Sequence, residues 1–431
     1  MVNNVVRPPT PVNEPVLGYL PGSNERTLLK AELVKQESEI LEIPCIINGE
    51  EVFTGDIVEQ VMPHDHSHVI ARVHMAGEKE VKSAIDAALQ AHDMWSTMPW
   101  ESRCAIFLKA SELLAGPRRA EINASTMLNQ SKTCHQAEID SACELIDFWR
   151  FNSDYCRQIY EDLQPPVSPS SMWNSSEIRP LEGFVFSVTP FNFSSIAANL
   201  PSSAAIMGNT GVWKPSRNSY VSNYRLMRLM MDAGLPAGVI NFIPGKASLV
   251  GDICMSHSEL AGVHFTGSTA VFRKMWKDIA NNLENLRSYP RIVGETGGKD
   301  FIVAHPDCDK RALTVALLRG AFEFQGQKCS ALAVLTFQKA SGMQSKMNIV
   351  KKYQKSVWGT QGISPISCLQ LSTESHSTIS PDISTGQRKT QVVKSLQVAV
   401  MMTKLVTLSS LRQFSVKTRD MNRWKRKYLV Q

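Results

Sequence analysis

Cys329 and Glu295 are the side chains of this 431-residue chain whose types and surroundings suit covalent chemistry. Glu295 lies in Gly294-Glu-Thr-Gly-Gly-Lys299, 34 residues before Cys329. A thiolate can add to a carbonyl carbon, and a carboxylate can then activate the water that hydrolyses the resulting thioester. The glycines around Glu295 are expected to leave room for substrate and water. The pair therefore predicts a nucleophile and a general base.

The segment before Cys329 bears on whether its thiol is reactive. A single cysteine is often an inert buried residue, and that reading is the alternative here. Gly326, Lys328 and Ser330 surround Cys329 with small and basic residues. Such a setting favours an accessible thiol in a positive environment.

An asparagine follows the apolar run 184–188, which reads as a buried strand. The segment Thr189-Pro-Phe-Asn-Phe193 comes next, and a predicted helix begins near Ser194. Asn192 would then lie at a strand-to-helix turn, where its amide could donate to an oxyanion. The alternative is an asparagine that caps the helix.

A lysine ends the next apolar run, in Gly211-Val-Trp-Lys-Pro-Ser216. At the end of a buried strand, Lys214 could hold ribose hydroxyls and help to keep a nearby thiol ionised. The alternative is a solvated surface lysine.

A Gly-Ser turn follows the short strand predicted at 263–265. Gly267 and Ser268 lead into a predicted helix that contains Thr269, Ala270 and Val271. A helix N-terminus of this kind offers N–H groups and a positive dipole to a pyrophosphate. The chain contains no G-x-G-x-x-G, so the usual dinucleotide fingerprint is missing.

The elements that must position these residues change character along the chain. Apolar periodicity predicts that 78–155 is mostly helical, and Pro and Ser at 164–171 predict a linker. Beyond it, short apolar runs alternate with helix-like segments. This order predicts an α/β fold with a mostly parallel sheet and ligands at the carboxyl ends of its strands. The predicted strands are 184–188, 211–213, 239–243, 263–265 and 301–304, and two of the helices between them are 195–207 and 221–233.

Charge and composition exclude several function classes. Residues 331–431 hold 16 basic and 3 acidic residues, so the +6 net charge comes from this part while residues 1–330 are acidic. Nucleic-acid binding loses its main support. The nine cysteines lack metal-like spacing, which predicts free thiols in a reducing compartment and no metal site. No apolar run is long enough to predict a membrane span.

Taken together, these motifs resemble the aldehyde dehydrogenases, and among them the 1-pyrroline-5-carboxylate (glutamate 5-semialdehyde) dehydrogenases of proline catabolism. The likeness covers roughly residues 12–331. The motifs shared with the wider family are Thr189-Pro-Phe-Asn-Phe, Trp213-Lys-Pro-Ser, Phe265-Thr-Gly-Ser, Gly294-Glu-Thr-Gly-Gly-Lys and Gly326-Gln-Lys-Cys-Ser. Those that indicate the narrower group are Asn13-Glu-Pro-Val-Leu, Gly116-Pro-Arg-Arg-Ala-Glu, Gln136-Ala-Glu-Ile-Asp and Glu144-Leu-Ile-Asp-Phe-Trp-Arg-Phe-Asn.

The resemblance implies an NAD-dependent oxidation of L-glutamate 5-semialdehyde to L-glutamate. Cys329 would attack the aldehyde, Asn192 and the Cys329 N–H would hold the oxyanion, and Glu295 would activate water. The implied cofactor contacts are Thr189, Lys214, Gly267, Ser268, Thr269, Ala270 and Val271. A homo-oligomer in the mitochondrial matrix is also implied, although the sequence shows neither a clear presequence nor the family's C-terminal dimerisation strand.

The same resemblance implies a division into domains. Residues 1–150 and 181–296 form a helical N-terminal region and a Rossmann-like NAD-binding domain. Residues 151–180 are a linker or oligomerisation arm, and 297–330 begin an incomplete catalytic domain that carries the nucleophile.

Residues 331–431 are predicted to be an aberrant and poorly ordered tail, because the family's Glu-Ile-Phe-Gly-Pro segment is not found there. Codons can be chosen for residues 424–431 that encode the Glu-Ile-Phe-Gly-Pro segment when they are read in another frame. This favours a frame-shift in the coding sequence. Little activity is then expected. The alternatives are an aldehyde dehydrogenase of another substrate and a non-catalytic nucleotide-binding fragment.

Overall fold

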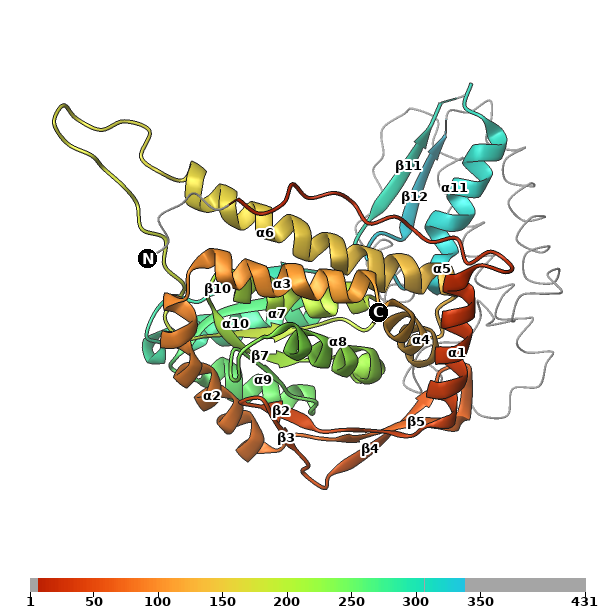
Figure 1. Ribbon diagram of the computed structural model, residues 1–431, viewed down its shortest axis with the longest axis horizontal. Helices are drawn as coiled ribbons and strands as arrows, with labels where there is room; N and C mark the ends of the chain where they lie inside the picture. The colour runs from red at the N-terminus through yellow and green to blue at the C-terminus, as the bar shows by residue number, and fades with distance from the viewer. Residues whose placement is uncertain (1–6, 306, 338–431) are drawn as a thin grey trace, which may run out of the picture. The chain divides into compact units, whose positions relative to one another are not determined.

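The computed structural model describes residues 7–305 and 307–337. The predictions for 338–431, including the frame-shifted tail, lie outside the described residues. The chain divides into two compact units between Thr296 and Gly297, and each unit is described by itself below (Figure 1).

The first unit is built on a seven-stranded mixed sheet. Its strand order is β10-β9-β6-β7-β8-β2-β3. Neighbouring strands from β10 to β8 run parallel, whereas β2 and β3 are antiparallel to their neighbours. The strand bounds are β10 Arg291–Glu295, β9 Leu260–Thr266, β6 Phe184–Val188, β7 Thr210–Lys214, β8 Ile240–Phe242, β2 Cys45–Ile47 and β3 Glu50–Val52.

The parallel strands are joined by helices, as the alternation of apolar runs predicted. Parallel strands need a crossover connection, which a helix supplies in each case here. The strands are rich in buried apolar residues because helices cover the sheet. The connecting helices are α7 Ser194–Ile206, α8 Tyr220–Ala233, α9 Ala247–Ser256 and α10 Thr269–Asn281. The predicted α/β class is therefore confirmed, and the strand predicted at 184–188 matches β6.

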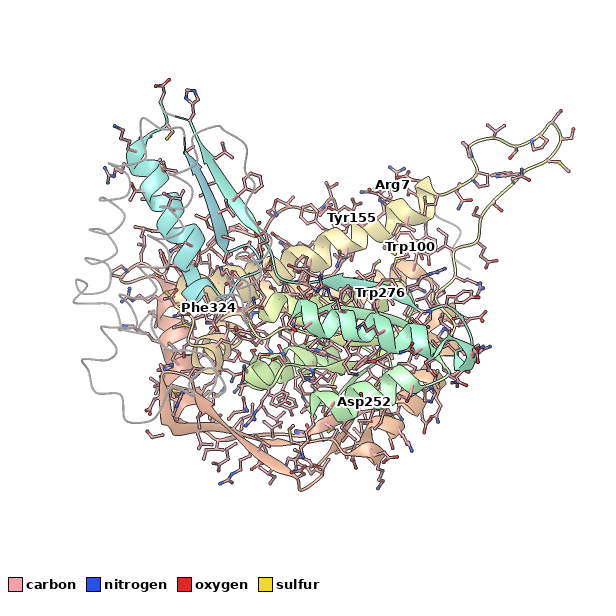
Figure 2. The ribbon with its side chains drawn as sticks, turned by 180° about the vertical axis from the view of Figure 1, so that it is seen from behind. Arg7, Trp100, Tyr155, Asp252, Trp276 and Phe324 are labelled. Atoms are coloured by element: carbon pink, nitrogen blue, oxygen red, sulfur yellow. The ribbon has the colours of Figure 1, made fainter. Side chains whose placement is uncertain are left out.

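Helix α10 rests on its sheet through a narrow apolar stripe. Met275 and Ile279 are its buried residues, whereas the Trp276 side chain keeps 51% of its surface exposed (Figure 2). The Phe272 ring stacks on that of Phe265 with the centroids 5.5 Å apart. These contacts anchor the helix whose N-terminus follows the Gly-Ser turn.

Residues 78–162 are mostly helical, which agrees with the helical character predicted for 78–155. Figure 1 shows α3 and α6 side by side, and the rings of Phe107 and Trp149 meet between them at 6.5 Å. This region buries three large apolar side chains, Trp95, Phe107 and Trp149. Helix α2 packs on the strands of the sheet and on α9. The elements of the region are α2 Glu78–Thr97, α3 Trp100–Ala115, α4 Arg119–Gln130, α5 Cys134–Ala137, the π-helix η1 Glu138–Cys143 and α6 Glu144–Asp162.

Residues 24–74 add a helix and a small second sheet that the sequence did not predict. The sheet order is β1-β5-β4, with β4 antiparallel and β1 parallel to β5. Charged and histidine residues interrupt the apolar alternation in these strands, which hides the period-two signal. The bounds are α1 Asn24–Ser38, β1 Leu41–Ile43, β4 Ile57–Met62 and β5 Asp65–His74, and two short 3₁₀ turns elsewhere are η2 Arg217–Ser219 and η3 Leu283–Asn285.

The second unit contains a βαβ arrangement. Strand β11, Asp300–Ala304, pairs in parallel with β12, Leu332–Phe337, and α11, Lys310–Phe322, connects them with the 3₁₀ turn η4, Glu323–Gly326. The strand predicted at 301–304 is β11, and it pairs with β12 in a sheet separate from the seven-stranded one. Pairing partners are set by tertiary contacts, which an apolar run does not specify.

Strand β12 bears on the order predicted for the tail. Residues 332–337 form a strand with five partners in β11 and one register shift, so the poor order predicted from residue 331 does not hold for them. The frame-shift stays a prediction. The run Leu-Ala-Val-Leu-Thr-Phe has the apolar and β-branched content that strands favour. Within the described parts of the chain, no helix is both long and apolar enough to cross a bilayer.

Candidate active site

The carboxyl ends of four neighbouring strands of the first unit form one row. The register pairs Glu295 with Thr266, Phe265 with Val188, and Val188 with Lys214. Adjacent strands lie about 4.8 Å apart, so Glu295 and Lys214 are separated by three steps, or roughly 14 Å across the sheet. Parallel strands thus bring the residues that follow them to one edge, as the sequence predicted.

Asn192 lies in the loop between β6 and α7. The residue that caps α7 is Phe193, and its side chain makes no capping hydrogen bond. The alternative that Asn192 caps this helix is therefore wrong. Its main-chain carbonyl accepts a hydrogen bond from Lys132 Nζ. This contact fixes the peptide that carries the Asn192 side chain.

Thr189 continues the ladder beyond β6. Its N–H donates to the Lys214 carbonyl at 3.3 Å, and its hydroxyl accepts from Trp213 Nε1 at 3.0 Å. Thr189 is buried. The two contacts tie the start of the Asn192 loop to the end of β7.

Lys214 is buried at the end of β7, with 8% of its surface exposed. The alternative of a solvated surface lysine is therefore wrong. Desolvation lowers the pKa of the Lys214 ammonium to about 8, because burial disfavours the charged form. A buried amine at the strand edge can donate to ligand hydroxyls that replace its lost water.

The Gly-Ser turn presents fewer N–H groups than its motif suggests. The Gly267 N–H donates to the Glu295 carbonyl at 3.1 Å, which joins the turn to β10. Ser268 is the N-cap of α10, and its hydroxyl accepts from the Val271 N–H at 3.3 Å. The prediction that the Gly267 N–H meets a pyrophosphate is not supported, since a sheet contact engages it. Among the residues that the structure describes, no main-chain carbonyl accepts from the N–H groups of Ser268, Thr269 and Ala270.

Glu295 is the last residue of β10 and is exposed. The adjacent glycines accommodate protein atoms rather than substrate. A Cβ at Gly294 would lie 2.3 Å from the Phe272 ring, and one at Gly298 would lie 1.9 Å from the Cys329 carbonyl oxygen. The space beside these two glycines is therefore already occupied by protein atoms, while the Glu295 carboxylate itself is exposed. The two glycines are needed because an aromatic ring and a main chain pass close by.

Cys329 lies in the second unit, in a turn closed by the Ala331 N–H and the Lys328 carbonyl at 3.1 Å. Its side chain is half-buried, and Lys328 Nζ lies 3.6 Å from a Glu323 carboxylate oxygen. The turn precedes the amino end of β12. Helix α11 and this turn position the thiol, and Gly298 meets its carbonyl within the same unit.

Three left-handed residues precede that turn. Phe324, Gln325 and Gly326 have φ values of 47°, 56° and 72°. Only glycine adopts this region without steric cost. The main chain before Cys329 is therefore strained at two non-glycine residues, a feature that often accompanies functional sites.

The first unit brings Asn192, Lys214, the Gly-Ser turn and Glu295 to one sheet edge, while Cys329 belongs to the second unit. Sequence reasoning missed Lys132 and Asp140, which lie behind the Asn192 loop. Asp140 belongs to the motif Gln136-Ala-Glu-Ile-Asp, which was used as a family marker and not as a site. No sequence signal pointed to Lys132.

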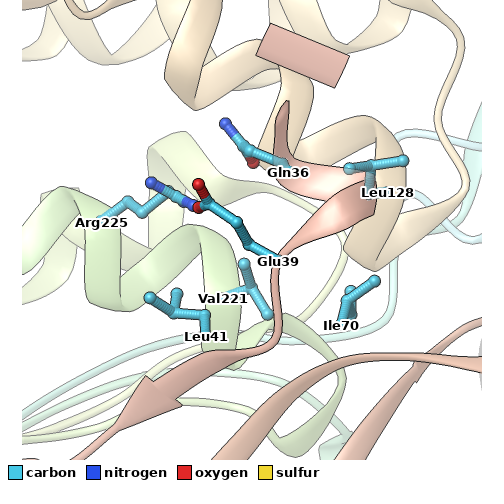
Figure 3. A pocket seen from close by; sticks show the side chains of 7 residues that line it. All are labelled: Gln36, Glu39, Leu41, Ile70, Leu128, Val221 and Arg225. Carbon is cyan, nitrogen blue, oxygen red and sulfur yellow. The ribbon is translucent and has the colours of Figure 1, made fainter. Parts of the chain in front are cut away.

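The first unit also contains a small pocket (Figure 3). Its lining comes from α1, β1, β5, α4, α8 and the segment after α1, and includes none of the predicted site residues. The lining residues are Gln36, Glu39, Leu41, Ile70, Leu128, Val221 and Arg225. The pocket holds no nucleophile, so it does not compete with the strand edge as the candidate site.

Comparison with known proteins identifies the class. The sequence model of the aldehyde dehydrogenase family matches residues 53–367, which extends beyond Ala331. The chain belongs to the aldehyde dehydrogenase family.

Within that family, the chain is similar to delta-1-pyrroline-5-carboxylate dehydrogenases. It is 50% identical over 324 residues to the Agaricus bisporus enzyme, covering 75% of this chain and 59% of the relative. It is 42% identical over 343 residues to the human mitochondrial enzyme, covering 80% and 61%. The chain thus spans about 60% of the length of these curated relatives.

Solved structures agree with this assignment. The crystal structure of the Mycobacterium tuberculosis delta-pyrroline-5-carboxylate dehydrogenase bound with NAD superposes with a TM-score of 0.80 at 43% identity, over 85% of this chain and 68% of that one. A 1-pyrroline-5-carboxylate dehydrogenase from Thermus with bound NAD gives a TM-score of 0.75 at 27% identity, over 82% and 67%.

Proposed function

We propose that this chain takes part in the NAD-dependent oxidation of L-glutamate 5-semialdehyde, the open form of 1-pyrroline-5-carboxylate, to L-glutamate. The observation that carries the proposal is the row of strand ends with Asn192, Lys214 and Glu295 in a chain whose relatives bear that name. The proposed domains are those of the sequence prediction. They are the NAD-binding region at 1–150 and 181–296, the arm at 151–180 and the catalytic start at 297–330.

The residues at the sheet edge fit a dinucleotide. Burial has removed water from the Lys214 ammonium, so a hydrogen bond to a ligand hydroxyl would stabilise its charged form. Ribose hydroxyls are suitable acceptors. The Thr269 and Ala270 N–H groups precede the first hydrogen bond within α10, from the Phe272 N–H to the Ser268 carbonyl. They can donate to a pyrophosphate oxygen with the helix dipole behind them. Thr189, Gly267, Ser268 and Val271 would shape the same surface. NAD supplies the hydride acceptor when bound.

The proposed chemistry begins at the Cys329 sulfur. The thiolate adds to the aldehyde carbon, and the C=O electron pair moves to oxygen. The Asn192 side-chain amide and the Cys329 N–H donate to that oxyanion, and preorganised donors are worth most where charge develops. Loss of hydride from the carbon then leaves a thioester on Cys329.

Glu295 completes the cycle by acid–base chemistry. Its carboxylate removes a proton from water, and the hydroxide adds to the thioester carbon. Breaking the C–S bond releases glutamate and regenerates the thiolate, which can attack the next aldehyde.

Three readouts test the proposal on the 431-residue chain. NAD titration should give saturable binding, iodoacetamide should label Cys329 with NAD-dependent kinetics, and 1-pyrroline-5-carboxylate should drive NADH formation at 340 nm. The aberrant region predicted at 331–431 would make the NADH rate low relative to a full-length relative. A Cys329→Ser variant should remove labelling and turnover. Absence of both NAD binding and Cys329 labelling would leave a scaffold and refute the proposal.

The alternative of a different aldehyde substrate is tested in the same assay. A semialdehyde that ends in a carboxylate should be oxidised in preference to a simple alkyl aldehyde of equal length. The relatives named as mitochondrial support a matrix location, and we propose a homo-oligomer for the assembled enzyme. Fractionation and light scattering test these two points.

A further inference from the structure

A buried ion pair, Lys132–Asp140, contacts the main chain of the loop that carries Asn192. Lys132 has no exposed surface, and its Nζ donates to Asp140 Oδ2 at 2.7 Å. The same Nζ donates to the main-chain carbonyl of Asn192 and lies 4.7 Å from the centroid of the Phe193 ring. One ammonium group thus contacts two consecutive residues of the loop that carries the proposed oxyanion donor.

A buried pair of this kind is not explained by stability. Desolvating two charges costs several kcal/mol, and well-packed apolar replacements of similar volume are often neutral or stabilising. The best attested reason to keep such a pair is that it specifies one arrangement of the groups it contacts. Here the group that it specifies is the Asn192 peptide.

The local fold aims Lys132 at this peptide. Helix α4 ends at Gln130, and Ser131 adopts a left-handed conformation with a φ of 55° that turns the chain inward. Thr133 is the N-cap of α5 and forms a capping box. Lys132 is therefore the one residue between the C-cap of α4 and the N-cap of α5.

The π-helix η1 supplies the acidic partner. Asp140 lies inside η1 and is 2% exposed. A π-helix adds a residue to the helical turn, which re-aims the side chains around it, and such segments recur at functional sites. The carboxylate of Asp140 thus meets Lys132 in the interior.

Two more contacts hold the residues just after Asn192. The Ser194 hydroxyl accepts from Gln130 Nε2 at 2.8 Å, and the Ser195 hydroxyl donates to Glu144. Residues 192–195 are therefore held by side chains from α4, from the segment between α4 and α5 that contains Lys132, and from the start of α6. All of these contacts lie within the first unit.

We propose that Lys132 is a positioning residue, which acts through the Asn192 carbonyl to hold the Asn192 side-chain amide in the direction that an oxyanion requires. Asp140 keeps the ammonium in place. The inference rests on the proposed function, because it gives Asn192 the role of donor. A donor held by a rigid main chain needs no reorganisation as charge develops, which is the source of its catalytic value.

The first test reads the Asn192 amide without any turnover. In protein labelled with ¹⁵N-asparagine, the Asn192 side-chain NH₂ signals are assigned by their loss in Asn192→Ala. Lys132→Met should shift or broaden them, because methionine fills similar space but cannot donate. Arg225→Met is the matched control: Arg225 pairs with Glu121 at 2.8 Å between α8 and α4 and should leave these signals unchanged. Unmoved Asn192 signals in folded Lys132→Met protein would overturn the proposal.

The second test uses kinetics. Removing one oxyanion donor costs about 10²–10³ in kcat, so Lys132→Met should lower kcat by at least roughly 10-fold with little change in the KM for NAD. In the Asn192→Ala background, Lys132→Met should not lower kcat further, because the side-chain amide through which Lys132 acts is absent. A multiplicative loss in the double variant would overturn the proposal. If Lys132→Met does not fold, Asp140→Asn takes its place in both tests, with a smaller shift and loss expected.

The two tests separate the inference from the proposed function. If the wild-type chain shows no turnover, the proposed function is refuted for this polypeptide. The NMR comparison still decides whether Lys132 controls the orientation of the Asn192 side-chain amide.

Discussion

Lys214 offers a prediction in which stability and binding move in opposite directions. Its pKa falls from 10.5 to about 8 through desolvation. One pKa unit corresponds to about 1.4 kcal/mol, so the shift represents roughly 3 kcal/mol of unfavourable burial of the charged form. Below pH 8 the ammonium is mostly charged in the folded and unfolded states alike, and the full cost is present. Lys214→Met should therefore stabilise the apo protein at pH 7 by up to roughly 3 kcal/mol.

The pH dependence has a definite sign. Between pH 8 and 10.5 the unfolded chain holds more protons at this lysine than the folded chain. Since stability rises with pH wherever the unfolded state binds more protons, the wild-type protein gains stability from Lys214 across this window. The advantage of Lys214→Met should shrink over the same range and approach zero near its upper end.

The assay is urea denaturation of apo protein at pH 7, 8, 9 and 10, followed by NAD titration at pH 7. The variant should unfold at higher urea and bind NAD at least roughly 10-fold more weakly, because a charge-assisted hydrogen bond is worth about 1.5–3 kcal/mol. Lys274→Met is the control, because Lys274 is exposed and pairs with Asp278 at 2.6 Å. A Lys214→Met protein that is no more stable than wild type at pH 7, with no pH-dependent difference, would refute the burial argument.

Three further substitutions, one of them with a control variant, probe other parts of the structure. Glu138→Ala should lower the free energy of unfolding in urea by about 3–5 kcal/mol, because it removes the carboxylate that three buried side chains contact. The control Glu182→Gln, in an exposed ion pair, should lower it by under about 1 kcal/mol. Gln325→Gly should stabilise by about 1 kcal/mol by relieving a left-handed residue, and equal or lower stability would contradict the strain. Gly298→Ala should displace the Cys329 main chain, because the new Cβ would lie 1.9 Å from the Cys329 carbonyl oxygen. The rate of iodoacetamide labelling at Cys329 should then change at least several-fold. An unchanged rate would show that the turn accommodates the extra atom.

Much of the sheet was readable in advance. Strand β6 and helices α7 and α8 fall within a residue or so of their predicted bounds, because buried parallel strands are continuous apolar runs. The small sheet of β1, β5 and β4 was not readable, since its strands are partly exposed and mix charged with apolar residues. Period-two patterning fails where neither face is fully buried.

The candidate site divides in the same way. Asn192, Lys214 and Glu295 were found because each follows an apolar run, and parallel strands end at one edge. Lys132 could not be found, because its partners come from the Asn192 loop and from η1. A lysine between two helices carries no local sign that it will be buried.

The sequence by itself determined the residue types, the order of the motifs and the alternation of strands and helices, because these depend on local composition and spacing. The tertiary structure alone decided that Lys214 is buried, that the Gly267 N–H bonds to β10, and that β11 pairs with β12. Burial, pairing and desolvation depend on residues distant in the chain that meet when it folds. Those contacts lower the pKa of the Lys214 ammonium and hold the main-chain carbonyl of Asn192, which the motifs by themselves leave open.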